Sequence, residues 1–206
     1  MDKAMLERAI SEVAVYDSHV HSALTIVGMP EPRQAAPGFA SLVRILVGQQ
    51  LSIKAAASIH TKFVHALDGD VQPKTVLSAS QDELRAAGLS YAKTRYIKAL
   101  ASMIEDGALD LDAIPALGEE QATGALTQVT GIGPWTAQIY LLFCEGRADI
   151  WPAGDLALQE ALRRLKARDV RPKPAETINL VEPWRPWRGA MAIFLWHYYA
   201  ASGAPV

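Results

Sequence analysis

Apolar residues recur along most of the chain at the spacing of helices that bury one face. No segment alternates apolar and polar residues over the length of a strand, and no internal repeat or low-complexity tract interrupts the pattern. Glycine, proline and short polar clusters separate the apolar segments. The predicted helical segments are residues 2–26 with a polar break at 17–19, 38–67 with a break at 48–50, 80–88, 89–103, 119–129, 134–144, 155–168 and 184–199. The pattern predicts an all-α fold.

A glycine turn between two of these helices carries the strongest local signal. Gly131-Ile132-Gly133 comes after the segment 119–129 and is followed directly by Pro134. Proline suits the first helical position, because its φ is already helical and it has no N–H to leave unpaired. Two glycines let the backbone approach a partner closely, and the N–H groups of the next helical turn suit an anion such as a phosphate. Alone, the pattern is also typical of a plain turn between helices.

Two further residues give this turn a specific context. Trp135 lies in the sequence GIGPWTA, and Asp155 stands twenty residues later, in a Pro-Ala-Gly-Asp segment before another predicted helix. Together these features resemble the helix-hairpin-helix DNA glycosylases, and in particular the alkylpurine branch represented by 3-methyladenine DNA glycosylase II. The resemblance covers roughly residues 39–199.

The resemblance implies a domain organisation. It predicts one compact glycosylase unit over residues 1–206, made of two packed helical subdomains with the active site in the cleft between them. Residues 39–126 would form the first subdomain, and residues 127–206 would hold the hairpin and the C-terminal helices. The N-terminal helix, residues 2–26, is expected to pack with the second subdomain.

Asp155 is the candidate catalytic residue, because it matches the family's aspartate position. Cleavage of an N-glycosidic bond builds positive charge on the deoxyribose, and a fixed carboxylate opposite that charge lowers the barrier. The same group can align or deprotonate the attacking water. An aspartate before a helix is also a favoured N-cap, and the two roles are compatible because a helix N-terminus favours the ionised carboxylate. Asp149 is the nearby rival and does not match the family position.

Aromatic residues are the candidates for a base pocket. Trp135 matches a pocket residue whose flat face favours a cationic methylated purine through stacking and cation–π attraction. It also stands where bifunctional relatives carry a lysine that forms a Schiff base, so the resemblance implies a monofunctional enzyme without lyase activity. Trp196 and Tyr140 are the other pocket candidates, and the family's pocket tyrosine falls at Ile139 here. Each of these aromatics could equally be a core residue.

The segment ILVGQQLS matches the place where the family inserts a side chain into the duplex to fill the gap left by a flipped base. Gln50 is the first candidate for this wedge and Leu51 the second. Some relatives carry an aliphatic residue at the Gln50 position, and the alternative interpretation is a polar turn between two helices.

The hairpin supplies the candidate contacts to the DNA backbone, namely Gly131, Gly133 and Thr136. By resemblance, the backbone carbonyls of Thr127, Val129 and Gly131 would also hold a Na or K ion when DNA is bound. No other cofactor is expected to be required. No side-chain pattern in the sequence suggests a zinc site.

Charge and cysteine content limit these interpretations. The net charge of −2 is not the basic footprint usual in nucleic-acid binders, unless the cations of residues 93–98 and 163–168 gather on one face. Cys144 is the only cysteine, which excludes a disulfide framework and a four-cysteine cluster and fits a reducing cytoplasm. No apolar stretch reaches the roughly 18–20 residues that a membrane span requires.

The resemblance thus implies a monomeric, intracellular base-excision repair enzyme that acts on double-stranded DNA containing damaged bases. It would flip an alkylated base, 3-methyladenine first and 7-methylguanine second, and hydrolyse it to leave an abasic site. One alternative is a glycosylase for deaminated or oxidised bases. The other is a non-catalytic helix-hairpin-helix module that only binds DNA.

Overall fold

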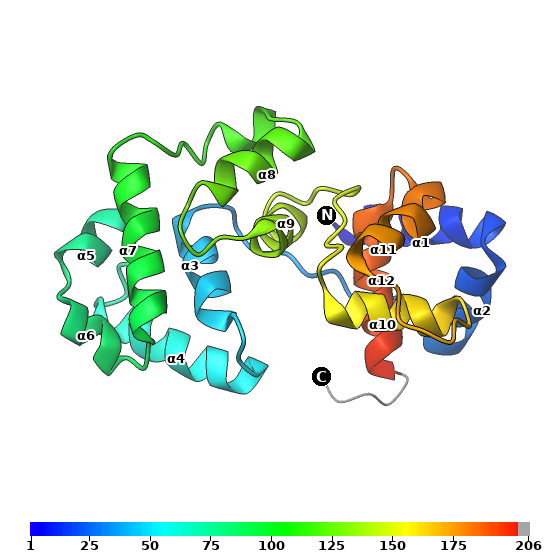
Figure 1. Ribbon diagram of the computed structural model, residues 1–206, viewed down its shortest axis with the longest axis horizontal. Helices are drawn as coiled ribbons and strands as arrows, with labels where there is room; N and C mark the ends of the chain where they lie inside the picture. The colour runs from blue at the N-terminus through cyan, green and yellow to red at the C-terminus, as the bar shows by residue number, and fades with distance from the viewer. Residues whose placement is uncertain (202–206) are drawn as a thin grey trace. The chain divides into compact units, whose positions relative to one another are not determined.

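The computed structural model describes residues 1–201, which form helices and contain no strand (Figure 1). The all-α prediction is therefore confirmed. The helices gather into two compact units. Unit 1 consists of Met1–Gln34 and the chain from Leu141 onward, and unit 2 consists of Ala35–Tyr140. None of the described helices is both long and apolar enough to cross a membrane.

Unit 2 holds the helices that lead to the glycine hairpin. They are α3 (Phe39–Gly48), α4 (Ile53–Ala66), α5 (Pro73–Ser78), α6 (Gln81–Ala86), α7 (Tyr91–Glu105), η1 (Ile114–Ala116), α8 (Glu119–Thr127) and most of α9 (Pro134–Phe143). Helix α7 packs against α3 and α5, and α4 packs against α3 and α6. Leu46, Phe63 and Ile97 are fully buried in this core. Because α7 packs on α3, a side chain of α7 reaches the turn that follows α3.

Unit 1 is built around its last helix. Its elements are α1 (Lys3–Tyr16), α2 (Ser18–Val27), α10 (Leu156–Leu165), α11 (Pro174–Val181), η2 (Glu182–Trp184) and α12 (Arg188–Ala201). Helix α12 contacts α1, α2 and α10, and its residues 190–195 are all buried. Gly189, near the start of α12, lets this helix approach the backbone of the loop after α9, since a Cβ there would lie 2.7 Å from the carbonyl oxygen of Arg147. The packing of α10 on α12 brings Asp155 and Trp196 together.

Asp17 divides the predicted N-terminal helix into two. Its Oδ1 accepts hydrogen bonds from the N–H groups of His19 and Val20 and so caps α2. Its Oδ2 accepts from Lys166 Nζ and Trp184 Nε1, both at 2.7 Å. Burial alone would raise the pKa of Asp17, but the bonds from Lys166 and Trp184 hold that pKa below its usual value. The polar break in the sequence is therefore an anchor for the rest of unit 1.

The observed division of the chain differs from the predicted one at the hairpin. The sequence places the boundary between residues 126 and 127, whereas the structure groups residues 127–140 with the helices before them. Unit 1 contains both the N-terminal and the C-terminal helices. The difference arises because the hairpin packs on α7 through Gly131 and Tyr96.

Candidate active site and nucleic-acid interface

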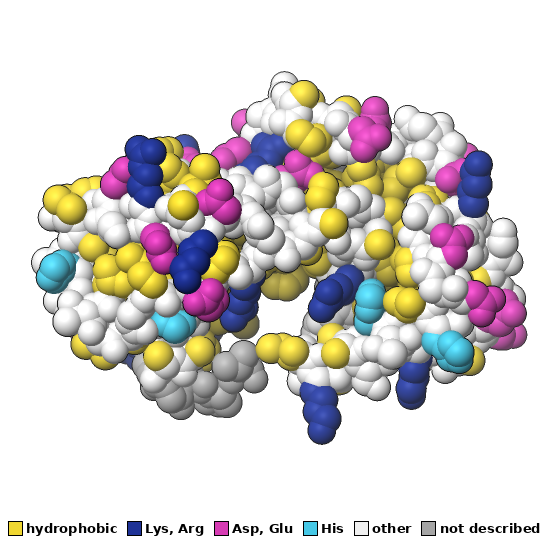
Figure 2. Space-filling model, turned by 180° about the vertical axis from the view of Figure 1, so that it is seen from behind, with side chains coloured by type: hydrophobic (Ala, Val, Ile, Leu, Met, Phe, Trp, Pro, Cys, Tyr) yellow, Lys and Arg dark blue, Asp and Glu magenta, His cyan; other side chains and the backbone are white. Residues whose placement is uncertain are grey.

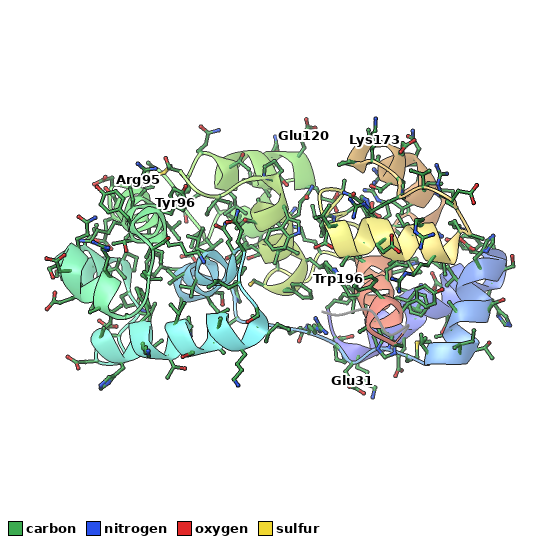
Figure 3. All side chains as sticks on the ribbon, turned by 60° about the horizontal axis from the view of Figure 1, so that its bottom comes forward. Glu31, Arg95, Tyr96, Glu120, Lys173 and Trp196 are labelled. Atoms are coloured by element: carbon green, nitrogen blue, oxygen red, sulfur yellow. The ribbon has the colours of Figure 1, made fainter. Side chains whose placement is uncertain are left out.

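The glycine hairpin joins α8 to α9 through a tight turn. The N–H of Ile132 donates to the carbonyl oxygen of Val129 at 3.0 Å, which closes the turn. Gly131 has φ +94°, a conformation that favours glycine. A Cβ on Gly131 would lie 2.2 Å from Cγ of Tyr96, which is labelled on α7 in Figure 3. Gly131 is therefore required both by its backbone angle and by close packing.

Gly133 differs from Gly131, because a Cβ there would meet no atom within 4 Å. It lies directly before Pro134, the first residue of α9. The first N–H groups of a helix have no partner inside the helix and favour an anion. The open space at Gly133 and these N–H groups fit the predicted backbone phosphate. The predicted DNA contact at Thr136 is less accessible, because its side chain is buried and its hydroxyl oxygen accepts a hydrogen bond from Gln49.

The turn after α3 is tied to this hairpin. Gln49 Nε2 donates to the carbonyl oxygen of Gly131 at 3.0 Å and to Thr136 Oγ1 at 2.9 Å. The next residue, Gln50, is exposed and has φ +58°, which is uncommon for a residue other than glycine. Leu51 is 39% exposed. Both wedge candidates are thus accessible, and the turn presents Gln50 in a strained conformation.

Asp155 caps α10, and its carboxylate is also bound by a tryptophan. Oδ1 accepts a hydrogen bond from the N–H of Leu158 at 2.9 Å and another from Trp196 Nε1 at 3.2 Å. The predicted N-cap role is confirmed by the first bond. The second bond brings together two residues that the sequence separates by forty-one positions. A carboxylate oxygen that accepts hydrogen bonds from a helix N-terminus and an indole N–H is fixed in position.

Trp196 lies beside a second aromatic ring. Its ring stacks on Phe143 with centroids 5.6 Å apart and an interplanar angle of 28°. The tryptophan is half-buried, and Figure 3 labels it on α12. The indole is thus held by the stack on one side and by Asp155 at its N–H. This arrangement offers a rigid aromatic surface next to a carboxylate.

The other pocket candidates lie in different environments. Trp135, in the first turn of α9, is 37% exposed. Tyr140 is fully buried, and its hydroxyl accepts a hydrogen bond from the N–H of Gly38 at 2.9 Å. This finding corrects the expectation that Tyr140 lines a base pocket, because a buried ring has no face for a base. Ile139, at the family's tyrosine position, is also buried.

The chain matches the model of the HhH-GPD superfamily of base excision DNA repair proteins over residues 43–186. It belongs to this family. It is 30% identical over 162 residues to YfjP of Bacillus subtilis, an alignment that covers 75% of this chain and 56% of YfjP. The chain thus spans little more than half the length of that relative.

Two solved structures of the family resemble the chain over nearly its whole length. The DNA-3-methyladenine glycosidase from Bacillus halodurans has a TM-score of 0.84 and 28% identity, and the match covers 95% of this chain and 91% of that one. The 3-methyladenine DNA glycosylase Mag1 of Schizosaccharomyces pombe, solved in complex with abasic DNA, has a TM-score of 0.84 and 26% identity, covering 96% and 97%. The predicted family and its alkylpurine branch are confirmed.

The rival carboxylate, Asp149, has a structural role in this family member. It accepts bonds from Nε and Nη2 of the buried Arg188, each at 2.9 Å, and from Arg185 Nη1 at 2.6 Å. Asp149 thereby neutralises a buried guanidinium at the start of α12. Trp184 and Trp187 are also structural, since Trp184 Nε1 donates to Asp17 and Trp187 Nε1 donates to Glu12, both at 2.7 Å.

The predicted basic clusters are largely used inside their own units. Hydrogen bonds from Arg163 and Arg164 lower the pKa of Glu160 to about 2. Lys166 binds Asp17, and Lys98 Nζ donates to the carbonyl oxygen of Ala79 at 2.6 Å. On the face shown in Figure 2, basic and acidic side chains are interspersed. These bonds leave fewer unpaired cations for a DNA contact than the sequence suggests.

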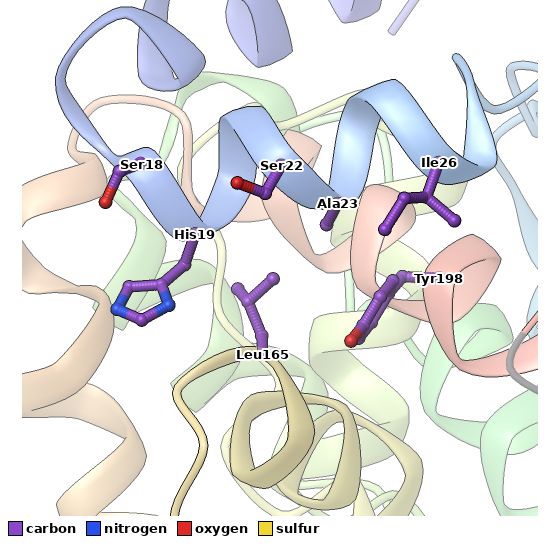
Figure 4. A pocket seen from close by; sticks show the side chains of 7 residues that line it. All are labelled: Ser18, His19, Ser22, Ala23, Ile26, Leu165 and Tyr198. Carbon is purple, nitrogen blue, oxygen red and sulfur yellow. The ribbon is translucent and has the colours of Figure 1, made fainter.

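Two small hollows lie outside the catalytic candidates. In unit 1, a pocket of about 230 Å³ is lined by side chains of α2, α10 and α12, among them His19 and Tyr198 (Figure 4). In unit 2, a groove of about 390 Å³ runs from Arg44 past Leu51 to His60. Burial, and then the charge of Arg44, lower the pKa of His60. The groove borders the turn at residues 49–51, called the wedge turn because it carries Gln50 and Leu51. The Figure 4 pocket contains none of the predicted site residues.

The three hairpin carbonyls suit a hard monovalent cation by their chemistry. Two of them already accept hydrogen bonds, Val129 from Ile132 and Gly131 from Gln49. A carbonyl oxygen has two lone pairs, so each keeps one for an ion. Within residues 1–201, no group of histidine, cysteine and carboxylate side chains is arranged to hold a metal.

Proposed function

We propose that this protein is a monofunctional DNA glycosylase that hydrolyses alkylated purines from double-stranded DNA and leaves an abasic site. The observation that carries the proposal is Asp155, held by α10 and Trp196 in a member of a base excision repair family. 3-Methyladenine is the proposed first substrate, in keeping with the names of the similar structures, and 7-methylguanine is proposed as the second. Action on cellular DNA implies an intracellular location, and we propose that the protein works as a monomer.

The chemistry needs little acid catalysis. A base methylated at a ring nitrogen is cationic, so the C–N bond to the sugar can break with its electron pair leaving on the base. Positive charge then develops on the deoxyribose, and the carboxylate of Asp155 stabilises that charge. A water molecule adds to the sugar and loses a proton, for which Asp155 is the candidate acceptor. Trp196 supplies an aromatic face for the cationic base.

The residue after Pro134 supports hydrolysis rather than lyase chemistry. An amine nucleophile would form a Schiff base with the sugar and lead to strand cleavage. Position 135 is a tryptophan, whose indole nitrogen cannot form that bond. The proposed product is therefore an intact strand with an abasic site. The role of Trp135 in stacking on the flipped base stays a prediction.

The hairpin is proposed to grip the DNA backbone. The N–H groups at the start of α9 would bind a phosphate across the open side of Gly133, giving position without sequence information. The carbonyls of Thr127, Val129 and Gly131 would hold a Na or K ion against the same backbone. Gln50 would enter the duplex in place of the flipped nucleotide, whose unstacking costs a few kcal/mol.

A competition among lesions tests the proposal. The protein is incubated with methylated duplex DNA mixed with duplexes containing uracil, hypoxanthine or 8-oxoguanine, and the released bases are identified. We expect methylated purines to be released fastest. Faster release of a deaminated or oxidised base would assign the enzyme to that damage instead. No release, with equal binding of damaged and intact duplex, would support the DNA-binding module.

Trp196→Phe tests the contact between the indole and the carboxylate. Phenylalanine keeps an aromatic ring beside Phe143 but removes the donor to Asp155. A hydrogen bond to a charged group contributes about 1.5–3 kcal/mol, so we expect single-turnover base release to fall by roughly tenfold to a hundredfold. The melting temperature should stay within a few degrees of the parent. An unchanged rate would show that the bond does not serve catalysis.

A further inference from the structure

The ammonium group of Lys93 binds backbone carbonyls at the C-terminal end of α3. This lysine lies in the first turn of α7, and its Nζ donates to the carbonyl oxygens of Val47 and Gln49, both at 2.7 Å. The last carbonyls of a helix lack partners inside the helix and favour a cation. Burial lowers the pKa of Lys93. Lys93 belongs to the cation cluster of residues 93–98, but its ammonium group is bound to the protein's own backbone.

Lys93 and Gln49 hold the two sides of one peptide segment. Lys93 binds the carbonyl that immediately precedes Gln50, and the Gln49 side chain binds the hairpin at Gly131 and Thr136. Tyr96, one helical turn after Lys93, packs under Gly131. Helix α7 therefore contacts the wedge turn through one residue and the hairpin through another.

The wedge turn needs such support. Gln50 has φ +58°, and for a residue with a side chain this conformation costs about 1–2 kcal/mol. The backbone bonds that close the turn, from Gln49 to Leu46 and from Leu51 to Gly48, are both 3.3 Å long, beyond the usual range. A strained conformation persists only when its surroundings hold it. Here the surroundings are the side chains of Lys93 and Gln49.

We propose that Lys93 and Gln49 are positioning residues that hold Gln50 ready for insertion and tie it to the hairpin. This inference rests on the proposed function, because it takes Gln50 as the wedge. The device places the wedge and the phosphate-binding hairpin in one rigid network. Insertion then requires no ordering of the turn when DNA arrives, and that ordering would otherwise oppose binding.

Lys93→Met tests the network, with Lys98→Met as its matched control. Both lysines are on α7, both donate to backbone carbonyls, and both substitutions remove one positive charge. Only Lys93 reaches the wedge turn. We expect Lys93→Met to slow single-turnover base release by about tenfold to a hundredfold, since a misplacement of about 1 Å can cost a hundredfold. Lys98→Met should change the rate less than about twofold.

A double-mutant cycle separates positioning from a general loss of structure. If Lys93 acts through the wedge, Lys93→Met should change the rate less than about twofold in a Gln50→Ala background. Gln49→Ala, which leaves the backbone carbonyl for Lys93, should behave in the same way and serves if Lys93→Met folds poorly. The same loss in both backgrounds, or a parent rate in Lys93→Met, would overturn the inference.

Hydrogen exchange of the free protein tests the positioning without DNA. Lys93→Met should speed exchange of the amides at residues 49–52, whereas Lys98→Met should leave them protected as in the parent. Unchanged exchange at residues 49–52 in Lys93→Met would overturn the inference, even where the parent protein releases base. If the parent releases no base, the proposed function fails, and the exchange result alone then decides whether Lys93 holds the turn.

Discussion

Asp155→Asn is expected to reduce single-turnover release of a methylated purine by at least about a hundredfold, the range seen when a stabilising group is removed from a transition state. The substitution removes the negative charge that faces the developing positive charge on the sugar. It also removes the proton acceptor for the attacking water. Lesion binding should be largely retained, because the hairpin and the wedge turn are untouched. Rates and affinities are measured on the same methylated duplex.

The fold should survive this change. Asparagine is as good an N-cap as aspartate, so the bond to the N–H of Leu158 can persist. Asp2→Asn is the matched control. Asp2 is also an N-cap aspartate, and it accepts a hydrogen bond from the N–H of Met5 at 2.8 Å, as Asp155 does from Leu158. Asp2→Asn should keep the parent rate. Equal rates for Asp155→Asn and Asp2→Asn would remove Asp155 from the mechanism.

Gly131→Ala is expected to produce the largest loss of stability. A Cβ at this position would overlap Tyr96, and φ +94° is unfavourable for alanine. The backbone strain costs about 1–2 kcal/mol and overpacking typically about 1–3 kcal/mol more. For a chain of this size, the sum corresponds to a fall in Tm of about 5–15 °C. Thermal unfolding followed by circular dichroism measures it.

Gly133→Ala separates stability from DNA binding at the same hairpin. A Cβ there meets no atom within 4 Å, so the free energy of unfolding should change by less than about 1 kcal/mol. The added methyl group would occupy the space proposed for the phosphate, so duplex affinity should fall. A comparable Tm loss in both variants would contradict the packing argument at Gly131. Unchanged affinity in Gly133→Ala would contradict the phosphate site.

Local features of the chain could be predicted from the sequence alone. The hairpin follows from two glycines and a proline, and the N-cap role of Asp155 follows from an aspartate before an apolar periodic segment. These signals act over a few residues, so no tertiary information is needed to read them. The apolar pattern does not predict helices α5 and α11, because they have six and eight residues and too few turns to establish a period.

The contacts that shape the site depend on packing between distant segments. In the sequence, Tyr140 cannot be told apart from an aromatic residue that lines a pocket. Its full burial and its hydrogen bond from Gly38 show that it belongs to the core. Lys93 reads as a surface cation until α7 packs on α3 and brings its ammonium group to two carbonyls. Phe143 carried no chemical signal at all, although it supports Trp196. Carbonyl acceptors and ring stacking leave no pattern in a single sequence.

The most direct test of the central claim is to measure free base and strand breaks on one methylated duplex, before and after alkali. Hydrolysis supported by Asp155 predicts free 3-methyladenine in both samples and strand breaks only after alkali, because an abasic site is stable until then. Strand breaks without alkali would contradict the account, since they would require an amine nucleophile in place of water.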